Sequence, residues 1–262
     1  MTVVIPTAPT LVYLKSYKTA STSFEIALLE SAKSAFPSGL DEPGMAFHVS
    51  IDAERYSLPV QRNSLFFRGV PRPRNELLDN RALRFAAKVM GAAFLKQHQS
   101  AKDVRKVLGD RLWKEAFKVT TIRNPWDLAV SRYRWMASGR EGRSGVVDIP
   151  FESFIEGFTG SGIIRAGYQN YKIKTLRQHL YPFVYDKNSF CCDDYVRFET
   201  LETDAAVLFE NLGLARPVFR KVKVSGSASQ PPHAYRDYYD DYSRMRVFKA
   251  AERFIKDFGY EF

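Results

Sequence analysis

The first hydrophobic run of the chain leads directly into a helical pattern. LVYLKS, residues 11–16, has the continuous apolar character of a buried strand. After a polar loop, apolar residues recur at helical spacing at Phe24, Ala27, Leu28 and Ala35. Thr22 and Glu25 have the S/T-x-x-E form of a capping box, so we expect a helix to begin at Thr22.

Strand and helix patterns alternate along the rest of the chain. The predicted elements are a helix over about residues 76–91, a helix capped by Ser100 and Asp103, a strand at AFKVTTI (116–122), a helix from Pro125, a strand at DDYVRFE (193–199), a helix closed by Gly213, and a carboxy-terminal helix on Val247, Ala251, Phe254, Ile255 and Phe258. Residues 64–76, 139–150 and 224–233 are predicted to be loops. This order predicts an α/β fold with a central, mainly parallel sheet flanked by helices, and a site at the carboxyl ends of its strands.

Composition narrows the class of protein. The chain has 262 residues, 45% of them hydrophobic, which is enough for one large domain over residues 1–262. The net charge of +10 favours an anionic partner: nucleic acid, a membrane surface, an acidic glycan or a phosphorylated cofactor. The adjacent Cys191 and Cys192 indicate reduced thiols. No leader and no apolar run long enough to span a membrane is visible, so we expect a soluble cytoplasmic protein, or one trimmed of its anchor.

The loop SYKTASTS, residues 16–23, has the chemistry of an anion site. It supplies the cation of Lys18, the hydroxyls of Thr19, Ser21, Thr22 and Ser23, and the unpaired backbone N–H groups of a helix start. The loop contains no glycine and is not a Walker A motif. The alternative interpretation is a capped helix with solvated lysines.

A second loop has a similar arrangement. In TTIRNPWDLAVS, Arg123 ends a strand, and Ser131 follows two helical turns later, off the predicted apolar stripe of the helix. Both side chains can reach one anion above the sheet. Taken separately, they are also consistent with a solvated arginine and an exposed serine.

Together the two loops resemble the sulfotransferases that use 3′-phosphoadenosine 5′-phosphosulfate, in particular the carbohydrate branch and its bacterial relatives. KTASTSFEIAL resembles the family's 5′-phosphosulfate loop, P-K-T-[AG]-G-T-S, and IRNPWDLAVSRY resembles its 3′-phosphate element, R-[DN]-P-x-x-R-x-x-S-x-Y. VRFETLETD and the carboxy-terminal sequence from His233 extend the resemblance over most of the chain. Tyr17, Ser21 and Leu128 stand where the family usually has proline, glycine and arginine.

The resemblance implies a P-loop-like sulfotransferase fold and transfer of a sulfuryl group to a hydroxyl acceptor, most simply a carbohydrate that can itself be acidic. It implies no nucleic-acid partner, and a sulfuryl group carries too little charge to require a metal. Carried over to this sequence, it assigns the 5′-phosphosulfate to Lys18, Thr19, Ala20, Ser21, Thr22 and Ser23, and the 3′-phosphate to Arg123 and Ser131.

In-line transfer also needs a group that stabilises the leaving oxygen and a base for the acceptor hydroxyl. Lys18 suits the first role. His98, in a loop before a helix, is the preferred base, with His48 and Glu25 as the other candidates. After the segment SGSASQPP, His233, Tyr235 and Arg236 are predicted to fold over the nucleotide, the alternative being a solvated helix start.

Two other functions fit parts of the sequence. A nucleotide-dependent kinase would use the first loop for phosphoryl transfer, but it needs Mg²⁺ and the lysine and hydroxyl of a Walker loop. A module without catalytic activity would bind a polyanion through Arg62, Arg68, Arg72 and Arg74. The four histidines are scattered in the sequence and have no metal-ligand spacing.

Overall fold

The computed structural model describes residues 3–5, 10–35, 65–67, 70–72, 92–94, 98–138, 149–166, 169–219 and 234–262. By their contacts, the residues fall into two compact units, between which the chain crosses several times. The first unit takes Met1–Ser16, Ala20–Thr121 and Pro182–Arg220, and the second takes Tyr17–Thr19, Ile122–Tyr181 and Lys221–Phe262. That residues 1–262 form a single domain remains a prediction.

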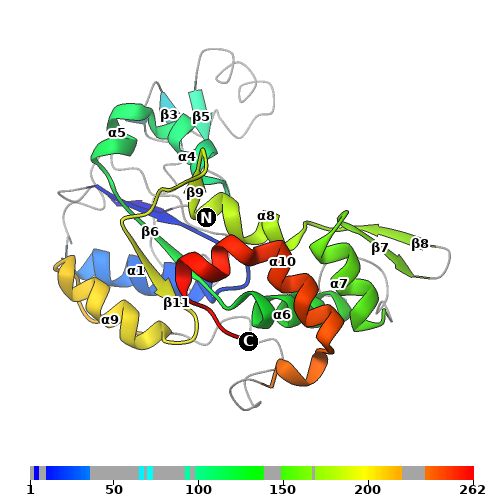
Figure 1. Cartoon of the computed structure of the whole chain (residues 1–262). Helices are drawn as coiled ribbons and strands as arrows, with labels where there is room; N and C mark the ends of the chain where they lie inside the picture. The colour runs from blue at the N-terminus through cyan, green and yellow to red at the C-terminus, as the bar shows by residue number, and fades with distance from the viewer. Residues whose placement is uncertain are drawn as a thin grey trace. The chain divides into compact units, whose positions relative to one another are not determined.

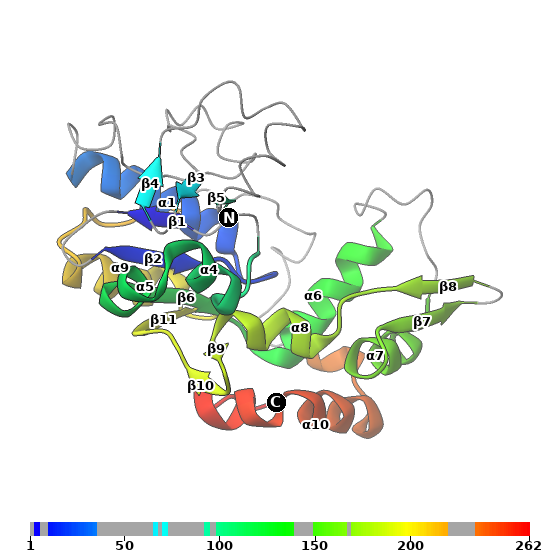
Figure 2. The same cartoon turned by 90° about the horizontal axis from the view of Figure 1, so that it is seen from above.

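The first unit is built on a four-stranded sheet (Figure 2). In spatial order its strands are β1 (Val3–Ile5), β2 (Leu11–Leu14), β6 (Phe117–Ile122) and β11 (Asp194–Arg197). β1 pairs antiparallel with β2, whereas β2, β6 and β11 form a parallel three-stranded part. This confirms the α/β class, the mainly parallel sheet and the strands predicted at residues 11–16, 116–122 and 193–199.

Helices cover both faces of this sheet (Figure 1). They are α1 (Ser21–Ala35), α4 (Ala101–Leu108), α5 (Asp110–Glu115) and α9 (Leu201–Asn211). Leu11 and Tyr13 of β2 belong to an apolar cluster with α1 and α9, while Val12 and Leu14 belong to a second cluster with α4 and α5. Because successive side chains of a strand point to opposite faces, one short strand contributes to both cores.

Local signals in the sequence set the ends of these helices. The Ser100 hydroxyl accepts a hydrogen bond from the Asp103 backbone N–H at 3.1 Å, which confirms the predicted start of α4. Gly213 follows α9 with φ +66, a left-handed conformation that glycine adopts without steric cost. Helix α1 begins at Ser21, one residue before the predicted start, and it also buries Ile26, which the apolar stripe did not include.

Shorter strands complete the first unit. They are β3 (Leu65–Phe67), β4 (Val70–Arg72) and β5 (Ala92–Phe94) in the order β4-β3-β5, and the pair β9 (Tyr185–Asp186) and β10 (Ser189–Phe190) after the 3-10 turn Tyr181–Phe183. The prediction of a simple loop over residues 64–76 is therefore wrong, because this stretch contains the strands β3 and β4. Pro71 does not prevent pairing, because β4 is an edge strand. The helix predicted over 76–91, most of the loop at 139–150 and the segment 224–233 lie outside the described residues.

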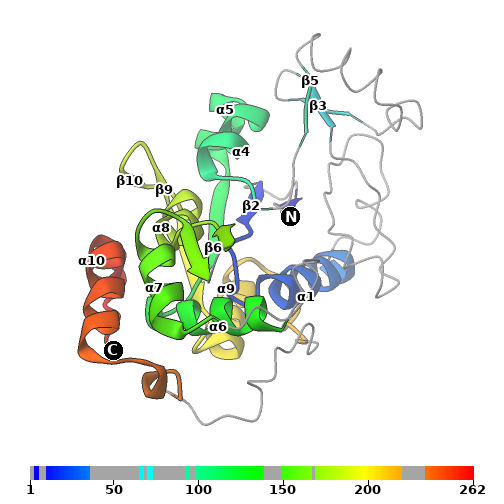
Figure 3. The same cartoon turned by 90° about the vertical axis from the view of Figure 1, so that its right-hand side faces the viewer.

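The second unit is mainly helical (Figure 3). It contains α6 (Pro125–Ala137), α7 (Phe151–Thr159), α8 (Leu176–Leu180), α10 (Asp241–Phe258), the hairpin of β7 (Ile163–Ala166) and β8 (Gln169–Lys172), and the 3-10 turn Arg236–Tyr238. Helix α10 contacts α6, α7 and α8. All five residues of its predicted apolar stripe are buried, which confirms the carboxy-terminal helix.

Candidate functional site

The carboxyl ends of β2 and β6 are joined by side-chain hydrogen bonds. The parallel register places Leu14 opposite Thr120. Just beyond this pair, the Ser16 hydroxyl donates to the Thr121 carbonyl at 2.5 Å and lies 3.1 Å from the Thr121 hydroxyl. The Tyr13 hydroxyl lies 3.0 Å from the same threonine oxygen. The two loops singled out in the sequence therefore leave from neighbouring strand ends that are fixed to each other.

A buried ion pair lies where β2 meets α1. The Lys15 ammonium is 2.6 Å from the Glu25 carboxylate, and the two side chains are only 2% and 0% exposed. The predicted capping box of Thr22 and Glu25 is therefore wrong. The helix starts at Ser21, and the Glu25 carboxylate binds the strand end instead. This pair ties the first turns of α1 to the strand before it.

His98, the preferred general base, lies beside the same strand end. It is half-buried, has φ +50, and its Nδ1 lies 3.2 Å from the Lys15 carbonyl oxygen. A carbonyl oxygen can only accept a hydrogen bond, so Nδ1 carries the proton in this contact. In the neutral ring the lone pair then belongs to Nε2, the nitrogen that would act as a base. Glu25, another candidate, is engaged by Lys15, and His48 lies outside the described residues.

The backbone of the first loop has two left-handed residues that are not glycine. Lys18 has φ +58 and Ala20 has φ +51, and neither of their following residues, Thr19 and Ser21, has a positive φ. Such a conformation costs an L-residue roughly 1–2 kcal/mol. An anion-binding nest needs left-handed residues that alternate with right-handed ones, and Lys18 and Ala20 supply two left-handed positions. Ser21 takes the place of the family's glycine without strain, because it already belongs to α1.

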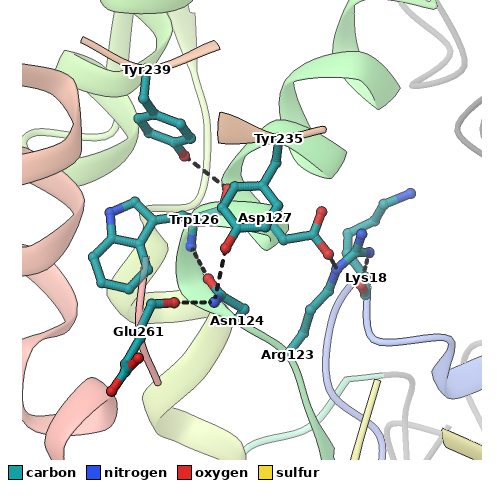
Figure 4. A network of polar contacts seen from close by, with 8 residues as sticks. All are labelled: Lys18, Arg123, Asn124, Trp126, Asp127, Tyr235, Tyr239 and Glu261. Carbon is teal, nitrogen blue, oxygen red and sulfur yellow. Dashed lines mark hydrogen bonds and ion pairs between the residues drawn. The ribbon is translucent and has the colours of Figure 1, made fainter. Parts of the chain in front are cut away.

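Arg123 joins the second loop to the first (Figure 4). Its Nη1 donates to the Lys18 carbonyl oxygen at 2.7 Å, and its Nε donates to the Asp127 carboxylate at 2.8 Å. The residue is 7% exposed. The two contacts hold it at the amino-terminal end of α6, whose first backbone N–H groups also favour an anion.

The start of α6 is fixed to the carboxy-terminal part of the chain. Asn124 caps the helix, accepting from the Trp126 backbone N–H at 3.0 Å, and its Nδ2 donates to the Glu261 carbonyl oxygen at 2.8 Å (Figure 4). The Tyr239 hydroxyl donates to the Trp126 carbonyl oxygen at 2.8 Å. Burial raises the pKa of Tyr239, so this hydroxyl stays protonated and donates. Arg123 therefore lies immediately before a helix start that these hydrogen bonds hold in place.

Tyr235 and Arg236, predicted to cover the nucleotide, take part in the same carboxy-terminal network. Tyr235 is buried, and its hydroxyl accepts from Asn124 Nδ2 at 3.4 Å. Arg236 is exposed, and its Nη2 donates to the Phe262 carbonyl oxygen at 2.6 Å. The structure thus gives both residues a packing role, and nucleotide binding by them stays a prediction. His233 lies outside the described residues.

Ser131 is more buried than the sequence suggested. It lies on α6 with 7% of its surface exposed, although the periodicity placed it off the apolar stripe. Leu128, which replaces the family's arginine, is fully buried in the same helix. That position serves packing in this chain.

Comparison of the chain with protein-family models, with curated proteins and with solved structures found no match. Within the described ranges, no three histidine, cysteine, aspartate or glutamate side chains gather as a potential metal site. None of the helices in those ranges is long and apolar enough to cross a membrane.

Sequence reasoning missed Trp135, Lys174 and His179. The Lys18 ammonium lies 4.1 Å from the centre of the Trp135 ring, and the Tyr17 and His179 rings are 4.9 Å apart. Trp135 had the appearance of an ordinary helical aromatic residue, and His179 lies far from either motif in the sequence. The basic and aromatic character of these residues was visible, but their proximity to the first loop was not.

Proposed function

We propose that this protein is a sulfotransferase with a P-loop-like fold, which transfers a sulfuryl group from 3′-phosphoadenosine 5′-phosphosulfate to a hydroxyl acceptor, in particular a carbohydrate. The observation that carries the proposal is the hydrogen bond from Arg123 Nη1 to the Lys18 carbonyl oxygen. It joins residues 105 positions apart, which belong to the two motifs that the resemblance assigns to the two ends of one nucleotide.

The first loop suits the 5′-phosphosulfate. Lys18 supplies a cation, and the left-handed backbone at Lys18 and Ala20 favours successive N–H donors directed at an anion. The resemblance adds the remaining residues of the loop, Thr19, Ser21, Thr22 and Ser23. Strained backbone of this kind is found preferentially where a ligand binds.

The second loop suits the 3′-phosphate. Arg123 can offer a guanidinium to phosphate oxygens, which bind this fork-shaped donor well. The Ser131 hydroxyl enters none of the hydrogen bonds found among the described residues, so an added phosphate oxygen would not have to displace such a partner. Arg123 lies next to the first turn of α6, where the helix dipole favours negative charge, and Ser131 lies further along the same helix.

The chemistry follows from these residues. The acceptor oxygen forms a bond to sulfur while the bond between sulfur and the bridging phosphate oxygen breaks, leaving adenosine 3′,5′-bisphosphate. Lys18 stabilises the negative charge that grows on the bridging oxygen, and by analogy with an oxyanion hole this is worth roughly 3 kcal/mol, or about a hundredfold in rate. His98 Nε2 takes the proton of the acceptor hydroxyl.

The two alternative functions require other features of the protein. A kinase needs Mg²⁺ and a Walker loop, and residues 16–23 contain no glycine. A module that binds polyanions needs only a basic surface, and nothing in that function requires a strained loop or an arginine held to its backbone.

The proposal is tested by the release of adenosine 3′,5′-bisphosphate from the donor, measured against a panel of saccharide acceptors. Lys18→Met should lower turnover about a hundredfold. Lys102→Met, at an exposed position of α4, is the matched control and should leave it unchanged. Equal turnover in wild type and Lys18→Met, or consumption of ATP in place of the sulfate donor, would refute the proposal.

A further inference from the structure

Four buried hydroxyl side chains form a network at the base of the first loop. Ser16 and Ser21 flank residues 17–20 of this loop, while Tyr13 belongs to β2 and Thr121 to β6. The Ser21 hydroxyl donates to the Ser16 carbonyl oxygen at 2.8 Å, which closes the loop between its two ends. The Ser16 hydroxyl in turn contacts both the carbonyl oxygen and the hydroxyl of Thr121.

Tyr13 connects this hydroxyl network to the start of α1. Its hydroxyl lies 3.0 Å from the Thr121 hydroxyl and donates to the Ser21 carbonyl oxygen at 3.3 Å. Burial raises the pKa of Tyr13, so its hydroxyl stays protonated and donates. The four residues are at most 5% exposed, so water has little access to these hydrogen bonds. Thr121 lies at the centre, because its hydroxyl is within 3.1 Å of both Tyr13 and Ser16.

The backbone that the network encloses is one that needs support. Lys18 and Ala20 have a positive φ without being glycine, a conformation that persists only where the surrounding structure determines it. Ser16 and Ser21, on either side of them, are the residues that the network fixes. Ser21 stands where the family usually has glycine, so the loop is closed here by a hydroxyl that the usual residue lacks.

We propose that the hydroxyl network positions the first loop for the 5′-phosphosulfate, and that Thr121 is its central positioning residue. The inference rests on the proposed function, because it takes Lys18 and the N–H groups of the loop to be the donors to the phosphosulfate. Donors that are already in place need no reorganisation when charge develops on the leaving oxygen. Thr121 therefore acts on the 5′ end of the nucleotide through the loop, without touching it.

The test compares two nucleotides in Thr121→Val, which keeps the shape of the side chain and removes its hydroxyl. Calorimetric affinity for adenosine 3′,5′-bisphosphate should fall about tenfold, and turnover with the sulfate donor should fall by a similar factor. Affinity for adenosine 3′-phosphate, which lacks the group that the loop holds, should change by less than about twofold. Thr121→Ser restores the hydroxyl and should recover most of the lost affinity and turnover.

The matched control is Thr120→Val. The Thr120 hydroxyl donates to the Leu14 carbonyl oxygen at 2.8 Å, so this variant also removes a fully buried hydrogen bond between β6 and β2. Successive side chains of a strand point to opposite faces, and Thr120 does not belong to the network. Thr120→Val should leave both affinities and turnover unchanged. If Thr121→Val does not fold, Ser16→Ala removes the hydroxyl next to it and should reproduce the loss for the bisphosphate alone.

Hydrogen exchange of residues 15–24 provides a readout that needs no ligand. Exchange should be several-fold faster in Thr121→Val and unchanged in Thr120→Val. An equal loss of affinity for the two nucleotides overturns the inference, as does an equal effect of Thr120→Val or an unchanged affinity in Thr121→Val. Failure of the wild type to bind either nucleotide would instead refute the proposed function, while the exchange comparison still decides whether the network holds the loop.

Discussion

Removal of one partner from the Lys15–Glu25 ion pair should destabilise the protein strongly. The ammonium and carboxylate are 2.6 Å apart and 2% and 0% exposed, so neither variant's remaining charge can reach water without local opening. Breaking a buried pair in this way costs about 3–5 kcal/mol, against a total stability of roughly 5–15 kcal/mol for a typical domain. Lys15→Met and Glu25→Leu should each lower the free energy of unfolding by about 3–5 kcal/mol.

The double variant separates the ion pair from simple loss of packing. Lys15→Met combined with Glu25→Leu leaves no buried charge and keeps similar side-chain volume, so it should be more stable than either single variant. Free energies of unfolding from urea titrations complete the double-mutant cycle. Lys256→Met is the control, because Lys256 and Glu252 form a pair of similar length, 2.8 Å, at 66% and 50% exposure. It should change stability by no more than about 0.5 kcal/mol.

Two results would refute this reasoning. A decrease in the free energy of unfolding below about 1 kcal/mol for both single variants would mean that the pair contributes no more than a surface salt bridge does. A double variant less stable than both singles would show that the charges are not what couples β2 to α1.

Three further predictions concern individual side chains. Burial lowers the pKa of His179 to about 3 in the folded protein, against about 6.5 in the unfolded chain, so unfolding takes up a proton between these pH values. The free energy of unfolding therefore has its full value above pH 6.5 and decreases by up to about 1.4 kcal/mol for each unit that the pH is lowered. In urea titrations, His179→Phe should lack this dependence of the unfolding free energy on pH. Ser131→Ala should weaken calorimetric binding of adenosine 3′,5′-bisphosphate about tenfold, whereas exposed Ser189→Ala should not, and equal affinity in both variants would contradict the phosphate role. His98→Gln should lower turnover 10²-fold or more with nucleotide affinity retained, and unchanged turnover would remove His98 as the base.

Much of the order of elements could be predicted because its causes are local. Capping residues act on the backbone within a few residues of themselves. The structure has helix ends at Ser100 with Asp103, at Pro125 with Asn124, and at Gly213. The capping box of Thr22 and Glu25 has the same local form, yet it was wrong. A lysine ten positions earlier in the sequence takes the carboxylate, which no local rule anticipates.

The candidate site could be predicted only as two separate loops. Strand periodicity and the two motifs identified Lys18 and Arg123, and the parallel pairing of β2 with β6 then explains why these loops meet. The environment of Lys18 depends on Trp135, which lies more than two turns along α6 and appears in the sequence as one aromatic residue among many. His179 is one of four histidines that are scattered in the sequence, and its burial depends on the fold.

The most direct test of the account is calorimetric binding of adenosine 3′,5′-bisphosphate, with and without Mg²⁺, to the wild type, to Arg123→Ala and to the exposed control Arg165→Ala. The account predicts micromolar binding, about −8 kcal/mol, that does not depend on Mg²⁺, survives in Arg165→Ala and is lost in Arg123→Ala. AMP and ATP should bind much more weakly. Absence of binding to the wild type, or tighter binding of ATP with Mg²⁺, would contradict the central claim.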